Sequence, residues 1–282
     1  MAVTVDASFP VSARDLTGSA TDVTWPTFTT PGTNRMVVAM LVANGAATNQ
    51  ISTMTSGNLT WTRAVEVVDG PNNWRVEIWT AWAASVVTTE QINTTYAAGR
   101  SYNRQSVIIW SLAGSDSSGV GNTGTTTTAN DGDVAITATA TGSLLLAGLP
   151  YRSAGGDIGV DANSTSQYNG GGGGGFGFNE RACSRASAGA GSLTLGFTTT
   201  ELLTSGAMAG VEIKAAAGGA TVQATASAAW GGLTATVTAT PLTPIQATSS
   251  APWGGLTATA SADVTSPAQA QLFMIRPTLV RR

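Results

Sequence analysis

The stretch Arg35 to Ala43, RMVVAMLVA, is a continuous apolar run with the length of a β-strand. A run without a polar face predicts a strand that is buried on both faces. Two later segments, Leu59 to Val68 (LTWTRAVEVV) and Trp74 to Ala83 (WRVEIWTAWA), alternate between apolar and polar residues, and the turn-forming stretch Asp69 to Asn73 separates them. This pattern predicts an antiparallel hairpin with a loop of medium length.

Segments of the same kind recur through the first 216 residues. They lie near Val3, near Val23, and at Glu90 to Tyr96, Gln105 to Ala113, Val134 to Thr141, Ser143 to Leu149, Ser192 to Thr198 and Ala207 to Ala215. About ten short strands without a helical apolar stripe between them predict an all-β fold, a jelly-roll-like antiparallel β-sandwich over residues 1–216. The segment from about Tyr151 to Gly191, which includes the glycine run Gly170 to Gly175, is expected to be a long loop.

The amino-acid composition indicates a packed protein and disfavours several classes of function. Charged residues make up 10% of the chain, the hydrophobic fraction is 42%, the net charge is −3 and the number of Trp is 8. Disorder favours low hydrophobicity with high charge, so most of the chain is expected to pack. Its 13 Lys and Arg are scattered, and no apolar run approaches the roughly 20 residues of a membrane span. We therefore expect neither nucleic-acid binding nor membrane insertion, and a soluble protein made in a cytoplasm without a secretory signal.

The end of the chain contains an internal repeat. Val222 to Pro241 (VQATASAAWGGLTATVTATP) matches Ile245 to Val264 (IQATSSAPWGGLTATASADV) at 13 of 20 positions, with a period of 23 residues. Each copy alternates Ala with Thr or Ser around a Gly-Gly pair that favours a turn, so residues 217–265 are expected to form two small β-hairpins. Because Ala buries little area, the bulkier residues are the expected anchors of the repeats: Trp230 and Leu233 in the first copy, and Trp253 and Leu256 in the second.

Residues 266–282 are expected to form a C-terminal arm. Leu272, Phe273 and Ile275 make it apolar, while Pro277 disfavours a helix. An apolar segment with no domain of its own is expected to dock on a neighbouring subunit, by adding a strand to an exposed sheet edge. Together with the small-residue hairpins, the arm indicates a homo-oligomer.

Candidate catalytic groups are few. The chain has no His, which excludes His-based nucleophile relays, acid–base steps and metal ligands, and Cys183, without a candidate base, is expected to be inert. Glycoside cleavage needs only two carboxylates, and Glu66 and Glu77 are placed to face each other across the predicted hairpin, although isolated acids on strands are usually solvated. Asp131-Gly132-Asp133 is more typical of a turn than of a calcium loop. We expect no enzyme activity, no cofactor and no metal.

Aromatic residues are the better candidates for contact with a partner. Most Trp, such as Trp82 beside aliphatic residues of its strand face, are expected in the core, whereas Trp74 or Trp79 is a candidate for an outward stacking platform. In the predicted loop, the glycines around Phe176 and Phe178 either make a flexible surface excursion or let these rings approach a partner closely. These four aromatic residues are the candidate contacts for a partner protein or a glycan.

Three segments, taken in order, resemble a β-sandwich module of minor tail proteins and fibres of tailed bacteriophages: Leu59 to Arg63 (LTWTR), Val76 to Ala81 (VEIWTA) and Gly142 to Gly148 (GSLLLAG). The two copies of Trp-Gly-Gly-Leu-Thr-Ala-Thr are similar to short repeats appended to such modules. The likeness covers about residues 15–265. It implies a virion surface component present in several copies, with other virion proteins as partners and a host surface glycan as a further candidate.

The resemblance implies a non-enzymatic, tail-associated structural protein or fibre on the particle surface. One alternative is a head decoration (cement) protein that stabilises the capsid. Another is a carbohydrate-binding module for host recognition, and a depolymerase of host polysaccharide is a more distant one. Copy number separates the first two, since a head protein is expected in far more copies per particle than a tail protein.

Overall fold

The computed structural model describes residues 1–15, 22–45, 51–69, 74–96, 102–127, 132–151, 159–170, 179–198, 206–216, 245–250 and 257–262. The chain divides into two compact units, Met1–Ala216 and Ala217–Arg282. Regular structure in the described residues consists of β-strands, so the predicted all-β fold is confirmed. No helix in these ranges is long and apolar enough to cross a membrane.

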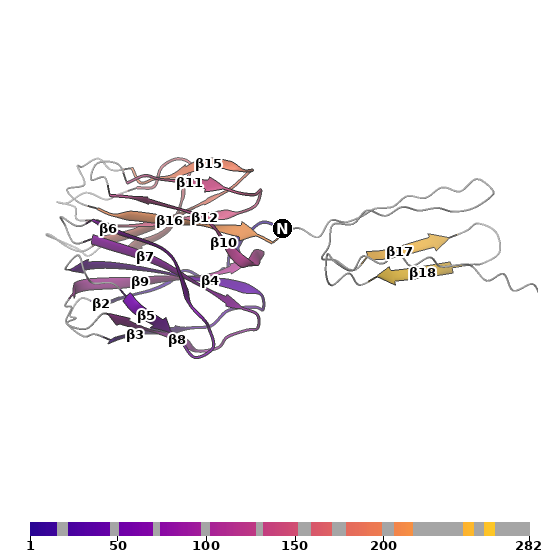
Figure 1. Ribbon diagram of the computed structural model, residues 1–282, viewed down its shortest axis with the longest axis horizontal. Helices are drawn as coiled ribbons and strands as arrows, with labels where there is room; N and C mark the ends of the chain where they lie inside the picture. The colour runs from indigo at the N-terminus through magenta and orange to yellow at the C-terminus, as the bar shows by residue number, and fades with distance from the viewer. Residues whose placement is uncertain are drawn as a thin grey trace, which may run out of the picture. The chain divides into compact units, whose positions relative to one another are not determined.

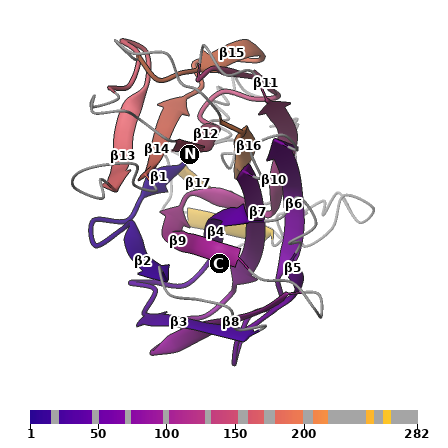
Figure 2. The same ribbon diagram turned by 90° about the vertical axis from the view of Figure 1, so that its left-hand side faces the viewer.

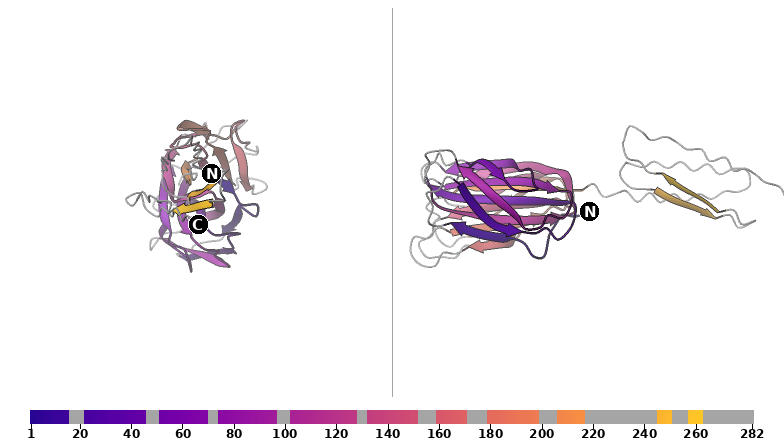
Figure 3. Two further views of the ribbon diagram at one scale, coloured as in Figure 1. Left: turned by 90° about the vertical axis from the view of Figure 1, so that its right-hand side faces the viewer. Right: turned by 90° about the horizontal axis from the view of Figure 1, so that it is seen from below.

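The strands of the first unit follow one another along the whole of its length. They are β1 (Thr4–Val5), β2 (Val11–Asp15), β3 (Asp22–Phe28), β4 (Arg35–Gly45), β5 (Ile51–Thr55), β6 (Thr62–Asp69), β7 (Trp74–Ala83), β8 (Glu90–Tyr96), β9 (Tyr102–Ala113), β10 (Ser115–Thr126), β11 (Val134–Ala138), β12 (Leu144–Tyr151), β13 (Thr165–Gly170), β14 (Asn179–Ala186), β15 (Gly191–Leu195) and β16 (Met208–Ala215). Seen from below, these strands run along a common direction (Figure 3).

The sheets of the first unit are stacked in layers (Figures 1 and 2). A six-stranded sheet has the order β1-β9-β4-β7-β6, with β2 also paired to β9, and a five-stranded sheet has the order β10-β16-β12-β14-β13. These two sheets pack face to face. The three-stranded sheet β3-β8-β5 covers the other face of the six-stranded sheet, and the two-stranded sheet β11-β15 covers the other face of the five-stranded sheet.

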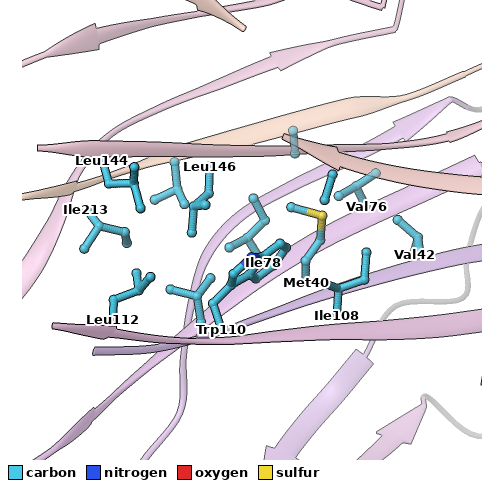
Figure 4. Close-up of a cluster of buried hydrophobic side chains, with 14 of the residues drawn as sticks. Met40, Val42, Val76, Ile78, Ile108, Trp110, Leu112, Leu144, Leu146 and Ile213 are labelled. Carbon is cyan, nitrogen blue, oxygen red and sulfur yellow. The ribbon is translucent and has the colours of Figure 1, made fainter. Parts of the chain in front are cut away.

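This stacking explains why β4 is apolar at consecutive positions. Met36, Val38 and Met40 point into the central core between the six- and five-stranded sheets. Met40 is labelled in this core in Figure 4. Val37 and Leu41 point the other way, into a core shared with the three-stranded sheet. The predicted burial of both faces is therefore confirmed, because side chains alternate along a strand and each face of β4 meets another sheet.

The same alternation holds for β12 in the five-stranded sheet. Leu144 and Leu146 join the central core, while Leu145, Ala147 and Leu149 join a third core beneath the two-stranded sheet. Both middle layers are thus sandwiched between neighbours. The first unit is accordingly a stack of sheets with three cores rather than a single sandwich.

The strand order shows that the first unit contains one fold twice. Lettered B to I in chain order, β2–β9 pair as B-I-D-G-F in one sheet and as C-H-E in the other. This is the order of a jelly roll in which strand F lies on strand G. The second half repeats this order, with β10-β16-β12-β14-β13 as B-I-D-G-F and β11-β15 as C-H. In place of strand E, Gly159 and Asp161 form backbone hydrogen bonds with Thr198 and Gly196, which follow strand H. Two jelly rolls are therefore packed back to back through their B-I-D-G sheets.

The two halves also agree in a backbone detail before strand D. Thr33 to Leu41 (TNRMVVAML) in the first half corresponds to Thr141 to Leu149 (TGSLLLAGL) in the second. At the second position of each segment the backbone is left-handed, with φ of 53° at Asn34 and 83° at Gly142. Each of these N–H groups donates to a carbonyl just after strand G, at 3.3 Å and 2.9 Å. Asn and Gly are the residues that adopt this conformation most readily, so the sequence meets the same backbone requirement twice.

The predicted loop from Tyr151 to Gly191 is wrong, because it contains β13 and β14. β14 (NERACSRA) pairs with β12 along its whole length and carries Glu180 and Arg181 at buried positions. Because charged residues occupy buried positions of β14, its sequence lacks the alternation of apolar and polar residues by which a strand is predicted. The β6–β7 hairpin is confirmed, with a bulge between Arg63 and Val65 that interrupts the alternation in β6.

In the second unit, the second repeat copy contains an antiparallel hairpin. β17 (Ile245–Ser250) pairs with β18 (Thr257–Ala262), and the pair nearest the turn is Ser250 with Thr257. In the sequence, the Gly-Gly pair of this copy lies between the two strands, outside the described residues. The first copy, all four anchors and the arm lie outside the described residues: Trp230, Leu233, Trp253, Leu256, Leu272, Phe273 and Ile275.

Candidate functional site

The two carboxylates singled out in the sequence do face each other. Glu66 on β6 and Glu77 on β7 are direct register partners. However, two arginines bind them. Nη1 of Arg75 lies 2.6 Å from Oε1 of Glu66 and 3.1 Å from Oε1 of Glu77, and Nη1 of Arg63 lies 2.6 Å from Oε2 of Glu66. The pair belongs to a charge-balanced cluster of four side chains, not to a solvated surface.

Glu77 is the most deeply buried member of this cluster, with its side chain 1% exposed. Its carboxylate also accepts hydrogen bonds from the N–H of Ile51 at 3.0 Å and from Nε1 of Trp79 at 3.1 Å. Burial raises the pKa of Glu77, and the bonds from Ile51 and Arg75 only partly offset this. Ile51 begins strand E (β5), and Glu77 lies on the strand next to strand F (β6). Strands E and F belong to different sheets here, so the bond from Ile51 to the Glu77 carboxylate links the two sheets. We assign it a structural role.

Trp74 and Trp79 do not form an outward platform, and this expectation is corrected. Trp74 is 4% exposed and lies in the central core, while Trp79 is 8% exposed and lies in the core beside the three-stranded sheet. β7 is a middle strand whose two faces are both covered, so Trp74 on one face and Trp79 on the other are buried. Phe176 and Phe178 lie outside the described residues.

The described residues contain no group of three or more metal-ligating side chains. Asp131 of the Asp131-Gly132-Asp133 turn lies outside them. Cys183 is buried, and burial raises the pKa of its thiol to about 12. At neutral pH this cysteine is therefore a protonated core residue.

A groove that the sequence did not indicate lies between the connection after β5 and the connection after β7. It encloses about 410 Å³ and is lined by Asn58, Leu59 and the segment 82–88. None of these lining residues carries a charge. Val86, at 46% exposure, and Met1 are the large hydrophobic side chains that stay exposed within the described ranges. The apolar Val86 in a turn-like stretch is the one signal in the sequence that could have pointed to this site.

The groove wall is fixed by a buried acid. Glu90, 2% exposed, accepts the N–H of Asn58 at 2.6 Å and its side-chain Nδ2 at 2.8 Å. On the opposite side, the N–H of Val87 donates to Oγ1 of Thr30 at 3.1 Å, and the N–H of Thr30 returns a bond to the carbonyl of Val87. Both connections that form the groove are therefore held in place by the body of the fold.

Comparison of the chain with protein-family models, curated proteins and solved structures finds no match. The likeness to phage tail modules consequently rests on the quoted segments, whose places are now defined. Leu59 to Arg63 enters β6, Val76 to Ala81 lies within β7, and Gly142 to Gly148 enters β12. All three are core-forming strands of one jelly roll or the other.

Acidification should loosen the groove wall through Glu90. Burial acts to raise the pKa of this carboxyl, but the hydrogen bonds from Asn58, Ser56 and Leu59 together outweigh it and lower the pKa below the usual 4.5. The stability from these bonds is thus complete above about pH 4.5 and is lost as the pH falls through the lower folded pKa. Glu90→Gln should remove this dependence, so thermal unfolding from about pH 6 to about pH 3 should show a shallower loss of stability in the variant. An equal loss of stability with falling pH in the unmodified protein and in Glu90→Gln would contradict this prediction.

Proposed function

We propose that this chain is a non-enzymatic structural protein of a tailed-bacteriophage particle, located on the tail surface as a minor tail or fibre protein. The observation that carries the proposal is the duplicated jelly roll of the first unit, followed by the WGGL repeat. Jelly rolls are a recurrent building block of viral shells and of lectins. The three segments that resemble phage tail modules overlap its strands β6, β7 and β12. The support is by analogy of fold and sequence style.

The use of the acidic side chains is consistent with a protein that acts through its surfaces. Glu77 and Glu180 are buried and paired with arginine, and Glu90 accepts backbone N–H groups. Glu212, fully buried, likewise accepts the N–H of Thr139 at 2.7 Å. Each of these carboxylates is buried, and the bonds that it accepts stabilise the fold.

Labelling of particles tests the proposal. Antiserum raised against the full chain should bind intact particles of the phage that encodes it, and gold-conjugated second antibody should appear on tails by electron microscopy. Quantitative mass spectrometry of purified particles should give a few to some tens of copies. Hundreds of copies with label on the head would favour the decoration protein instead. Absence of the chain from purified particles would contradict any structural role.

A further inference from the structure

We propose that the groove lined by Asn58, Leu59 and residues 82–88 binds a neutral saccharide. The inference deepens the proposed function, since it gives the particle-surface protein a class of ligand and a site for it. It rests on the lining and on the rigidity of the groove. It needs none of the four aromatic residues that the sequence suggested as contacts.

The chemistry of the lining suits a sugar better than other ligands. Ser85 and Thr88 are exposed and present hydroxyl groups, and Asn58 uses Nδ2 on Glu90, which leaves its amide oxygen as an acceptor. Leu59 and the exposed Val86 supply apolar contact beside these polar groups. Sugars combine hydroxyl groups with apolar C–H faces. A charged ligand would find no counter-charge on the lining residues, and a lipid chain would meet too many polar groups.

The size and rigidity of the groove support binding. Its volume of about 410 Å³ lies within the range of small-molecule sites. Because Glu90 fixes one wall and Thr30 fixes the other, a ligand does not have to order these connections when it binds. An exposed aliphatic side chain on a rigid wall loses water contact without a conformational cost. Val86 therefore gains burial when a sugar covers it.

The test uses the full chain and a panel of neutral hexoses, 6-deoxyhexoses, N-acetylhexosamines and their disaccharides, read out by saturation-transfer NMR. At least one saccharide should receive saturation and bind with a Kd near about 1 mM or tighter. Ser85→Arg, which fills the groove from an exposed position, should weaken that binding at least about tenfold. The matched control Ser192→Arg places the same side chain at an exposed position on β15, in the outer two-stranded sheet of the second jelly roll, and should leave the Kd within about twofold.

The outcomes are separable from those of particle labelling. Saturation of no saccharide in the panel would overturn the inference, as would binding that survives Ser85→Arg unchanged or that both arginine variants weaken equally. In either case a protein found on tails keeps its proposed structural role. Conversely, if the chain is absent from particles but binds a saccharide in the groove, the saccharide site is supported and the virion proposal is contradicted.

Discussion

Replacing Arg14 by methionine is expected to lower the free energy of unfolding by about 3–5 kcal/mol, because it leaves a buried carboxylate without its partner. Arg14 lies on β2 of the first jelly roll and Glu180 on β14 of the second, with Nη2 2.7 Å from Oε2. The Glu180 side chain is 0% exposed. Urea unfolding followed by circular dichroism measures the loss. It should appear as a lower midpoint with an unchanged slope.

Two further variants show whether the loss comes from the stranded charge. Arg14→Met combined with Glu180→Met should recover most of the stability, since an apolar pair of similar volume removes the charge altogether. Burial raises the pKa of Glu180, and without Arg14 the offset from the ion pair is gone. The deficit of the single variant should therefore shrink as the pH falls through the raised pKa and the carboxyl is protonated. Arg185→Met, at an exposed hydrogen bond, should cost less than about 1 kcal/mol. A similarly small cost for Arg14→Met would contradict the prediction.

Replacing Trp110 by alanine is expected to cost about 3–5 kcal/mol and to destabilise both jelly rolls together. Trp110 is fully buried on β9 in the central core, beside side chains of β12 and β16 (Figure 4). Its loss removes contacts that the two halves share. Chemical unfolding should still show a single transition, at a lower denaturant concentration, because neither half keeps an intact inner face.

Trp110→Phe is the matched control for this variant. Nε1 of Trp110 finds no hydrogen-bond partner among the residues that the structure describes, so phenylalanine keeps most of the ring contacts and sacrifices no bond there. It should cost roughly half as much as alanine, or less. Two separate transitions in Trp110→Ala would contradict the shared core, since they would mean that one half stays folded when the other has lost its support.

Much of the fold could be predicted from apolar patterns, and the failures have identifiable causes. RMVVAMLVA in β4 carries apolar residues for two different cores, so its burial on both faces follows directly from the sequence. β14 was missed because its buried positions include Glu180, whose partner Arg14 is 166 residues away. No local pattern can reveal a charge that is satisfied at such a distance.

The duplication of the jelly roll was also invisible in the sequence. Thr33 to Leu41 and Thr141 to Leu149 are identical at only 3 of 9 positions, and the apolar residues at the others differ in size. What the halves share is the order of strands and a left-handed residue before strand D, which can be recognised only once pairing is known. The prediction of Trp74 or Trp79 as an outward contact was wrong for a related reason. Trp74 and Trp79 become interior because other sheets cover β7, and the groove arises from two connections far apart in the chain.

The back-to-back pairing of the jelly rolls has a consequence for how the two halves can change. Two identical subunits joined in this way would separate on dilution, and every substitution would appear twice across their symmetry axis. Joined in one polypeptide, the halves stay together at any protein concentration, and each is free to evolve alone. The ion pair between Arg14 and Glu180 joins strand B of the first half to strand G of the second, so the interface between the halves is not symmetric.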